Sequence, residues 1–300
     1  MSNKTCLIII MILVSLSQFA QARSYDDIIA ANEITIAVYR DFPPYSFEQN
    51  GQAKGIDIHL ANAIAHGLGV KLTLLWATPG ETTADDLRMY LWKGNNLHTN
   101  DGTRVKADLM LRIPYDKNYA QMRDDQGLLV HEQVHMFAPY QQERWQIAYN
   151  PNKLEQIATM AVFQYHKIGV EIDSAPQFYL TTAFNGRLRN NTKTYLDIRD
   201  AFAAMTQTNA VDAVMGIKSQ IEWLHQQHPQ QTHISQQTYP LFDTYKWDIG
   251  MAVGNDYRQL ATPSKTYCSI NLNSNIYTNG QRNLVSVISS LSYTNKSLLK

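Results

Sequence analysis

Residues 34–72 read ITIAVYRDFPPYSFEQNGQAKGIDIHLANAIAHGLGVKL, and this stretch decides the fold class. It overlaps the β-branched and apolar segment 33–39, which predicts a buried strand. The prolines of segment 42–45 end that strand, because proline cannot donate to a sheet ladder. In segment 55–68 apolar residues recur at the spacing of one helix face. Segment 70–76 predicts a second strand, so the unit is a strand, a helix and a strand joined by a right-handed parallel crossover.

The rest of the chain repeats this alternation of strands and helices. Expected strands cover residues 107–113, 130–137, 168–172, 211–215 and 247–253, and expected helices cover 85–92, 175–184, 194–206 and 219–227. This order predicts two successive α/β units, with a last strand that can rejoin the first unit.

Composition and charge exclude several classes of protein. The 300 residues are 44% hydrophobic and carry 26 Lys+Arg against 26 Asp+Glu. Such a composition excludes a chain that is disordered throughout, and the length suits one or two domains. Zero formal charge without a long basic run argues against nucleic acid as a partner, because counterion release needs clustered cations.

The N-terminus has the pattern of a secretory signal peptide. Lys4 gives a positive start, residues 7–16 are apolar, and Ala20-Gln21-Ala22 forms a cleavage site. We expect residues 1–22 to be removed, which places a mature protein beginning at Arg23 in the periplasm. The mature chain then holds one cysteine, Cys268, so it forms no internal disulfide.

Six segments, in order, resemble the type 2 periplasmic solute-binding proteins of family 3. They are residues 34–72, ADLMLRIP (107–114), FAPY (137–140), KIGVEIDS (167–174), VDAVMG (211–216) and IGMAVGND (249–256). The resemblance implies a two-lobed α/β fold with a central cleft and two hinge crossings. It places lobe 1 at residues 23–140 plus 252–300 and lobe 2 at residues 141–251.

The resemblance also implies a function. Such proteins capture a small polar solute between the lobes and usually deliver it to an inner-membrane ABC permease. We therefore expect a monomeric binding protein without cofactor, metal or catalysis. Two alternatives stay open, namely an accessory or sensory binding module for a periplasmic dehydrogenase or receptor, and a dehydratase-like enzyme on the same fold that uses cleft carboxylates as acid or base.

Three candidate ligand residues belong to the first lobe. Phe42 follows a strand end, where the resemblance implies a ring that covers the solute, and packing in the lobe core is the alternative. Tyr39 offers a hydroxyl to a ligand or serves as a core strand residue. Arg112 ends the third strand and needs an anion partner, which is either the solute or a protein carboxylate such as Asp108.

Glu171, Asp173 and Ser174 are the candidates in the second lobe, where the resemblance implies ligand contacts. Two α-amino-acid clamps of the family look absent. Ala120 stands near the position of the usual arginine, and Gly216 with Ile217 stands in place of the usual aspartate. The solute is then a cation, a zwitterion of different geometry or a neutral polyol, and the sequence does not choose among them.

Two further features need an interpretation. His131 and His135 belong to an H-E-x-x-H motif, which binds zinc when it lies on a helix. The segment is extended by its pattern, which separates the two rings by about 13 Å at ~3.3 Å per residue, so we expect no zinc centre.

Beyond about residue 262 the chain departs from the family, and Pro263 is expected to interrupt the last helix.

Overall fold

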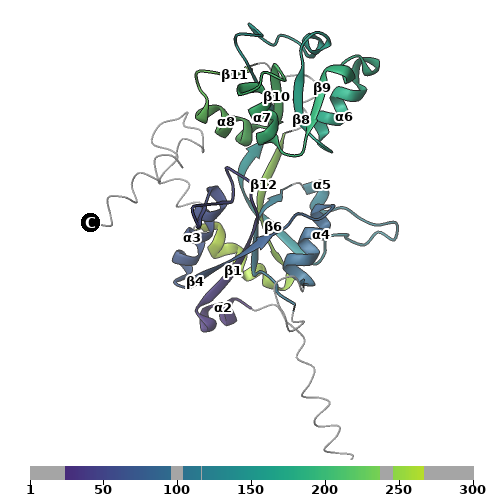
Figure 1. The fold of residues 1–300 in the computed structure, drawn as a ribbon. Helices are drawn as coiled ribbons and strands as arrows, with labels where there is room; N and C mark the ends of the chain where they lie inside the picture. Colours follow the sequence, from purple (N-terminus) through teal and green to yellow (C-terminus); the bar gives the residue numbers. More distant parts are fainter. Residues whose placement is uncertain (1–23, 96–103, 116, 237–245, 267–300) are drawn as a thin grey trace, which may run out of the picture.

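The computed structural model describes residues 24–95, 104–115, 117–236 and 246–266, which form two lobes, each built on a five-stranded sheet (Figure 1). The first sheet has the order β4-β1-β5-β12-β6. Its strands are β1 (Glu33–Tyr39), β4 (Lys71–Ala77), β5 (Leu109–Pro114), β6 (Val134–Glu143) and β12 (Trp247–Gly254). The helices of this lobe are α2 (Tyr25–Ala31), α3 (Ile56–Leu68), α4 (Thr83–Leu87), which continues as a π-turn (Arg88–Trp92), and α5 (Lys117–Ala120). A hairpin of β2 (Phe47–Gln49) and β3 (Gln52–Lys54) precedes α3.

The second sheet has the order β11-β7-β10-β8-β9. Its strands are β7 (Trp145–Tyr149), β8 (Ile168–Glu171), β9 (Thr192–Tyr195), β10 (Ala213–Ile217) and β11 (His233–Ile234). Its helices are α6 (Ala175–Thr182), α7 (Ile198–Thr206) and α8 (Lys218–Gln227). Short 3-10 turns cover Met160–Gln164, Ala183–Gly186, Arg189–Asn191 and Asn255–Tyr257.

The first strand-helix-strand unit forms as the sequence predicts. β1 and β4 pair in parallel, and Ile36 lies opposite Leu74. Ile64 and its helical neighbours on α3 are buried against this sheet. Gly69 ends α3 in the left-handed region at φ 70°, and its N–H reaches the carbonyl of Ala65.

Two antiparallel strands connect the lobes. β6 continues directly into β7, and β12 returns to the first sheet between β5 and β6 (Figure 1). Trp145 and Trp247 pack at this crossing with ring centroids 5.2 Å apart. The expected return of the last strand to the first unit is confirmed, whereas the residue limits assigned to the lobes remain a prediction.

Three local expectations were wrong. The segment 194–206 begins as β9, which pairs in parallel with β8, and α7 begins only at Ile198 after the N-cap Asp197. Residues 130–133 form turns, so the strand expected there begins at Val134. Residues 258–266 are helical, so Pro263 does not interrupt this helix within the described residues, where Leu260 and Ser264 bury one face.

The expected signal peptide, Cys268 and the unusual tail beyond residue 266 lie outside the described residues. Within the described ranges, no helix has the length and apolar character needed to cross a membrane.

Candidate functional site

Arg112 projects from a bulge in the central sheet of the first lobe. Leu111 pairs with Met251 and Ile113 pairs with Gly250, so Arg112 is the extra residue on β5. Its φ of 62° lies in the left-handed region, which non-glycine residues rarely adopt. The bulge turns Arg112 out of the strand alternation and leaves Leu111 and Ile113 fully buried in separate core clusters. Such a backbone outlier, held by a sheet, points to a functional residue.

The guanidinium of Arg112 lies among three aromatic rings, which we call the aromatic cage. Its central carbon is 3.4 Å from the ring centroid of Phe42, 5.0 Å from that of Tyr45 and 5.5 Å from that of Tyr39. These rings attract a cation through their electron-rich faces. The cage therefore orients Arg112, and one face of Phe42 is covered by a protein group.

Arg112 makes no hydrogen bond or ion pair with any described residue. Its Nε is buried without a partner. The competing partner, Asp108, instead accepts a hydrogen bond from the Thr35 backbone N–H at 2.8 Å. The Nη donors of the guanidinium are thus free of protein partners within the described residues and suit a planar anion.

Glu171 approaches the same region from the second lobe. It ends β8, and the backbone of Ile198 at the start of α7 has a lowering effect on its pKa. Burial first, and then the charge of Asp197, raise the pKa of Glu171, whereas Arg112 and Arg199 oppose that rise. The charge of Arg112 thus acts on this carboxyl across the two lobes.

The other predicted site residues have roles within the protein. Tyr39 is 7% exposed, and its hydroxyl donates to Asp86 Oδ2 at 2.6 Å. Ser174 is the N-cap of α6, and its hydroxyl donates to the carbonyl of Glu171 at 2.6 Å. Asp173 is exposed at φ 57°, and its backbone N–H donates to Gln177 Oε1. Their contact with a solute remains a prediction.

Comparisons with known proteins agree with this architecture. Residues 34–86 match the family model of bacterial extracellular solute-binding proteins, family 3. Over this segment, the chain is similar to the family 3 solute-binding proteins. A search of curated proteins gives no match.

Several solved binding proteins share the fold. An ancestral cationic amino acid solute-binding protein, AncCDT-1, superposes with a TM-score of 0.60 at 16% identity, covering 89% of this chain and 98% of that one. An amino acid ABC transporter substrate-binding protein from Streptococcus pneumoniae, bound to L-arginine, gives 0.57 at 17% identity and covers 90% and 98%. Holo ArgBP from T. maritima gives 0.53 at 18% identity and covers 82% and 93%.

Sequence reasoning missed two groups of side chains where the lobes meet. Tyr45 donates its hydroxyl to the buried carboxylate of Glu143 on β6, and Ser219 at the start of α8 donates to the same carboxylate at 2.5 Å. Three parts of the chain therefore meet at one buried acid. The YSF segment after two prolines carries no pattern that identifies this partner, because Glu143 lies 98 residues away.

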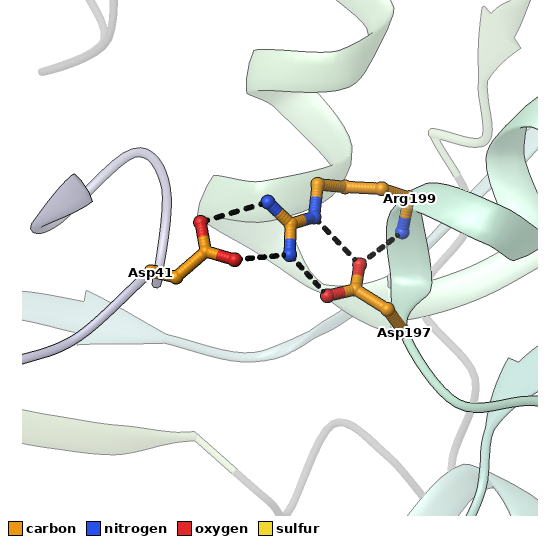
Figure 2. Close-up of polar contacts among 3 residues, drawn as sticks. All are labelled: Asp41, Asp197 and Arg199. Atoms are coloured by element: carbon orange, nitrogen blue, oxygen red, sulfur yellow. Dashed lines mark hydrogen bonds and ion pairs between the residues drawn. The ribbon is translucent and has the colours of Figure 1, made fainter. Parts of the chain in front are cut away.

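The second missed group is an ion-paired set formed by Asp41, Asp197 and Arg199 (Figure 2). Arg199 Nη1 and Nη2 donate to the two Asp41 carboxylate oxygens at 2.9 and 2.8 Å. Asp197 accepts from Arg199 Nε at 2.8 Å and from its Nη2 at 2.5 Å. Asp197 was recognisable as an N-cap, since it directly precedes an amphipathic run, but its pairing with Asp41 was not.

The H-E-x-x-H segment does not form a helix. His131 lies in a turn with its ring stacked on Tyr119 at 4.1 Å, and His135 lies in β6 with its ring stacked on Phe137 at 5.9 Å. Within the ranges that the structure describes, no group of three or more His, Cys, Asp or Glu side chains is arranged to hold a metal ion.

Proposed function

We propose that this protein captures a small solute between its lobes through an anionic group at Arg112 and delivers it to an inner-membrane ABC permease. The unpaired, caged guanidinium of Arg112 is the observation that carries the proposal. A half-buried cation without a charged partner among the described residues is costly, and a carboxylate in its fork lowers that cost. The expected signal peptide would place this activity in the periplasm.

Glu171 supports a solute that also carries a donor group. A carboxylate on Arg112 leaves Glu171, on the opposite lobe, to accept from an ammonium or hydroxyl of the same molecule. A solute that contacts both lobes stabilises only the closed arrangement, so binding and closure form one equilibrium. A zwitterion or a hydroxy acid meets both requirements.

The solved structures that share the fold do not identify the solute, because their 16–18% identity shows only the fold. Two details favour a site unlike an α-amino-acid clamp. Arg123 lies three residues beyond Ala120, which stands near the clamp position, and its Nη1 donates to the carbonyl of Gly127 at 2.6 Å, so it is committed within its own loop. At Gly216, an added Cβ would lie 2.8 Å from Ile198 Cδ1, so an aspartate there needs a shift of the core.

A paired-ligand titration tests this proposal. A thermal-shift screen over small acids and zwitterions first finds a solute, because a bound ligand raises the unfolding midpoint. Calorimetry then compares that solute with its carboxamide analogue on the wild type and on Arg112→Gln. We expect the wild type to prefer the carboxylate and Arg112→Gln to lose this preference, since charged hydrogen bonds contribute about 1.5–3 kcal/mol. An undiminished preference in Arg112→Gln would refute the assignment.

Delivery to an importer is tested separately. Proteoliposomes that contain the ABC permease should take up the solute and hydrolyse ATP faster when the mature protein is added. Binding without any stimulation, together with co-purification with a periplasmic dehydrogenase or receptor, would support the accessory or sensory role instead.

One observation favours a second candidate, a dehydratase-like enzyme. The raised pKa of Glu171 suits a general acid that protonates a leaving hydroxyl, while Arg112 holds the substrate carboxylate. Release of water from hydroxy acids, followed by NMR and absent in Glu171→Gln, would support catalysis. Binding without turnover would leave the protein a solute carrier.

A further inference from the structure

We propose that Asp41 and Arg199 are positioning residues that hold the two lobes together when no solute is bound. Asp41 follows β1 in the first lobe, and Arg199 begins α7 in the second lobe (Figures 1 and 2). Their side chains meet through two parallel N–H to carboxylate hydrogen bonds of 2.8 and 2.9 Å. This bidentate geometry is the most specific form of an arginine–carboxylate pair. We call it the interlobe latch.

The second lobe orients its half of the latch without help from the first. Asp197 caps α7 and binds the guanidinium through Nε and Nη2, which leaves the Nη edge directed toward Asp41. Although partial burial raises the pKa of Asp197, its hydrogen bonds with Arg199 hold that pKa below its usual value, so this support stays charged at neutral pH. A preoriented fork loses little conformational freedom when the lobes meet.

The first lobe presents Asp41 through its backbone. Asp41 lies in the left-handed region at φ 51°, directly before the turn that carries Phe42. Asp and Asn tolerate this conformation better than most residues do. The acid is therefore held on the segment that also forms the aromatic cage, which couples the latch to the solute site.

Other contacts bring the lobes together in the same arrangement. Phe47 of the β2–β3 hairpin packs on Trp223 of α8 with ring centroids 5.9 Å apart. Tyr45 and Ser219, from the two lobes, share the carboxylate of Glu143 at the crossing. None of these contacts requires a solute.

The latch acts on the site through Glu171. Glu171 pairs with Tyr195 of β9, two residues before Asp197, so the latch lies next to the second-lobe half of the site. Burial first, and then the charge of Asp197, raise the pKa of Glu171. The Asp41 and Arg199 side chains are 60% and 37% exposed, so salt should weaken the latch.

The test measures the lobes of the solute-free protein, and it is therefore independent of which solute binds. Spin labels at Glu48→Cys on β2 and Gln226→Cys on α8, both exposed positions, report the distance across the lobes in a Cys268→Ser background. We expect Asp41→Asn to lengthen or broaden this distance and to enlarge the radius of gyration in X-ray scattering. Asp41→Glu should restore the shorter distance in part.

Asp200→Asn is the matched control, because it removes an exposed acid from the next position of α7. We expect it to leave the distance unchanged. Raised salt should lengthen the distance in the wild type and change Asp41→Asn much less. Equal distances in wild type and Asp41→Asn at low salt, with both proteins folded by their melting curves, would refute the latch. An equal opening in Asp200→Asn would refute it as well.

Discussion

At the scale of single residues, Asp57 is an acid whose burial disfavours its charged form. Its side chain is fully buried, its Oδ1 accepts from the Tyr140 hydroxyl at 2.8 Å, and its Oδ2 has no partner. Burial raises its pKa from 3.8 to about 6, against the lowering effects of Tyr140 and Arg112. The folded state thus holds this proton more tightly than the unfolded state does.

The raised pKa of Asp57 predicts that the stability of the fold depends on pH. The contribution of Asp57 is fully present below pH 4 and is lost as the pH rises through about 6, where the charged form must be buried. Asp57→Asn should remove that loss and raise the free energy of unfolding at pH 7 by no more than about 3 kcal/mol, at 1.36 kcal/mol per pKa unit. Urea unfolding of both proteins from pH 4 to 8 measures it. Parallel curves for the two proteins would contradict the prediction.

Phe42 provides a second prediction at this scale. Because its ring carries the guanidinium at 3.4 Å, Phe42→Leu should keep the bulk but lose the orientation of Arg112. We expect affinity for an anionic solute to fall by about 0.5–2 kcal/mol, the range of cation–π interactions. The carboxamide analogue should lose less affinity. Phe178→Leu is the control in calorimetry, because the Phe178 side chain is exposed on α6. An equal loss for both ligands would mean that the ring contacts the solute directly.

At the scale of elements, Gly250 supports the bulges on both sides of β12. A Cβ there would lie 2.7 Å from the Phe137 carbonyl oxygen and 3.2 Å from that of Ala138, so backbone must move. Gly250→Ala should therefore lower the free energy of unfolding by about 1–3 kcal/mol, the usual cost of overpacking. Because Gly250 also pairs beside Arg112, solute affinity should fall too. A melting curve that overlaps the wild type would contradict this prediction.

The cap of α6 is a second element whose role can be measured. Ser174 accepts from the Gln177 N–H, so Ser174→Ala should lower the free energy of unfolding by about 1 kcal/mol. Ser24→Ala removes the equivalent cap of α2, far from the site in sequence and in the other lobe, and is the control for stability. A loss of solute affinity in Ser174→Ala alone would support the predicted ligand contact, and unchanged affinity would leave only the cap.

At the scale of the whole molecule, the expected export of the chain is tested separately from its binding of a solute. The A-x-A site predicts a mature N-terminus at Arg23. Mass spectrometry of the periplasmic fraction should find Arg23 as the first residue of most molecules. Retention of residues 1–22 on most of the protein would contradict the expected export route.

The sequence by itself determined the order of the α/β units and pointed to one residue of the proposed site. Local periodicity was sufficient for β1, α3 and β4, because a strand and a helix each bury a face that is visible within a few residues. Arg112 was recognisable because an arginine in an apolar strand needs a partner. Where several local signals competed, as in the TKTY segment that became β9, only pairing with β8 decided the outcome.

Only the tertiary structure decided how the site is assembled. The bulge at Arg112 depends on its register with β12, about which the residues around Arg112 carry no information. The cage and the Glu143 contacts need side chains from β5, β6 and the turn after β1 to converge. The interlobe latch joins residues 158 positions apart, and its geometry depends on how the lobes meet. Periodicity reports which face of an element is buried, whereas contacts between lobes follow from packing and hinge geometry, which no local pattern encodes.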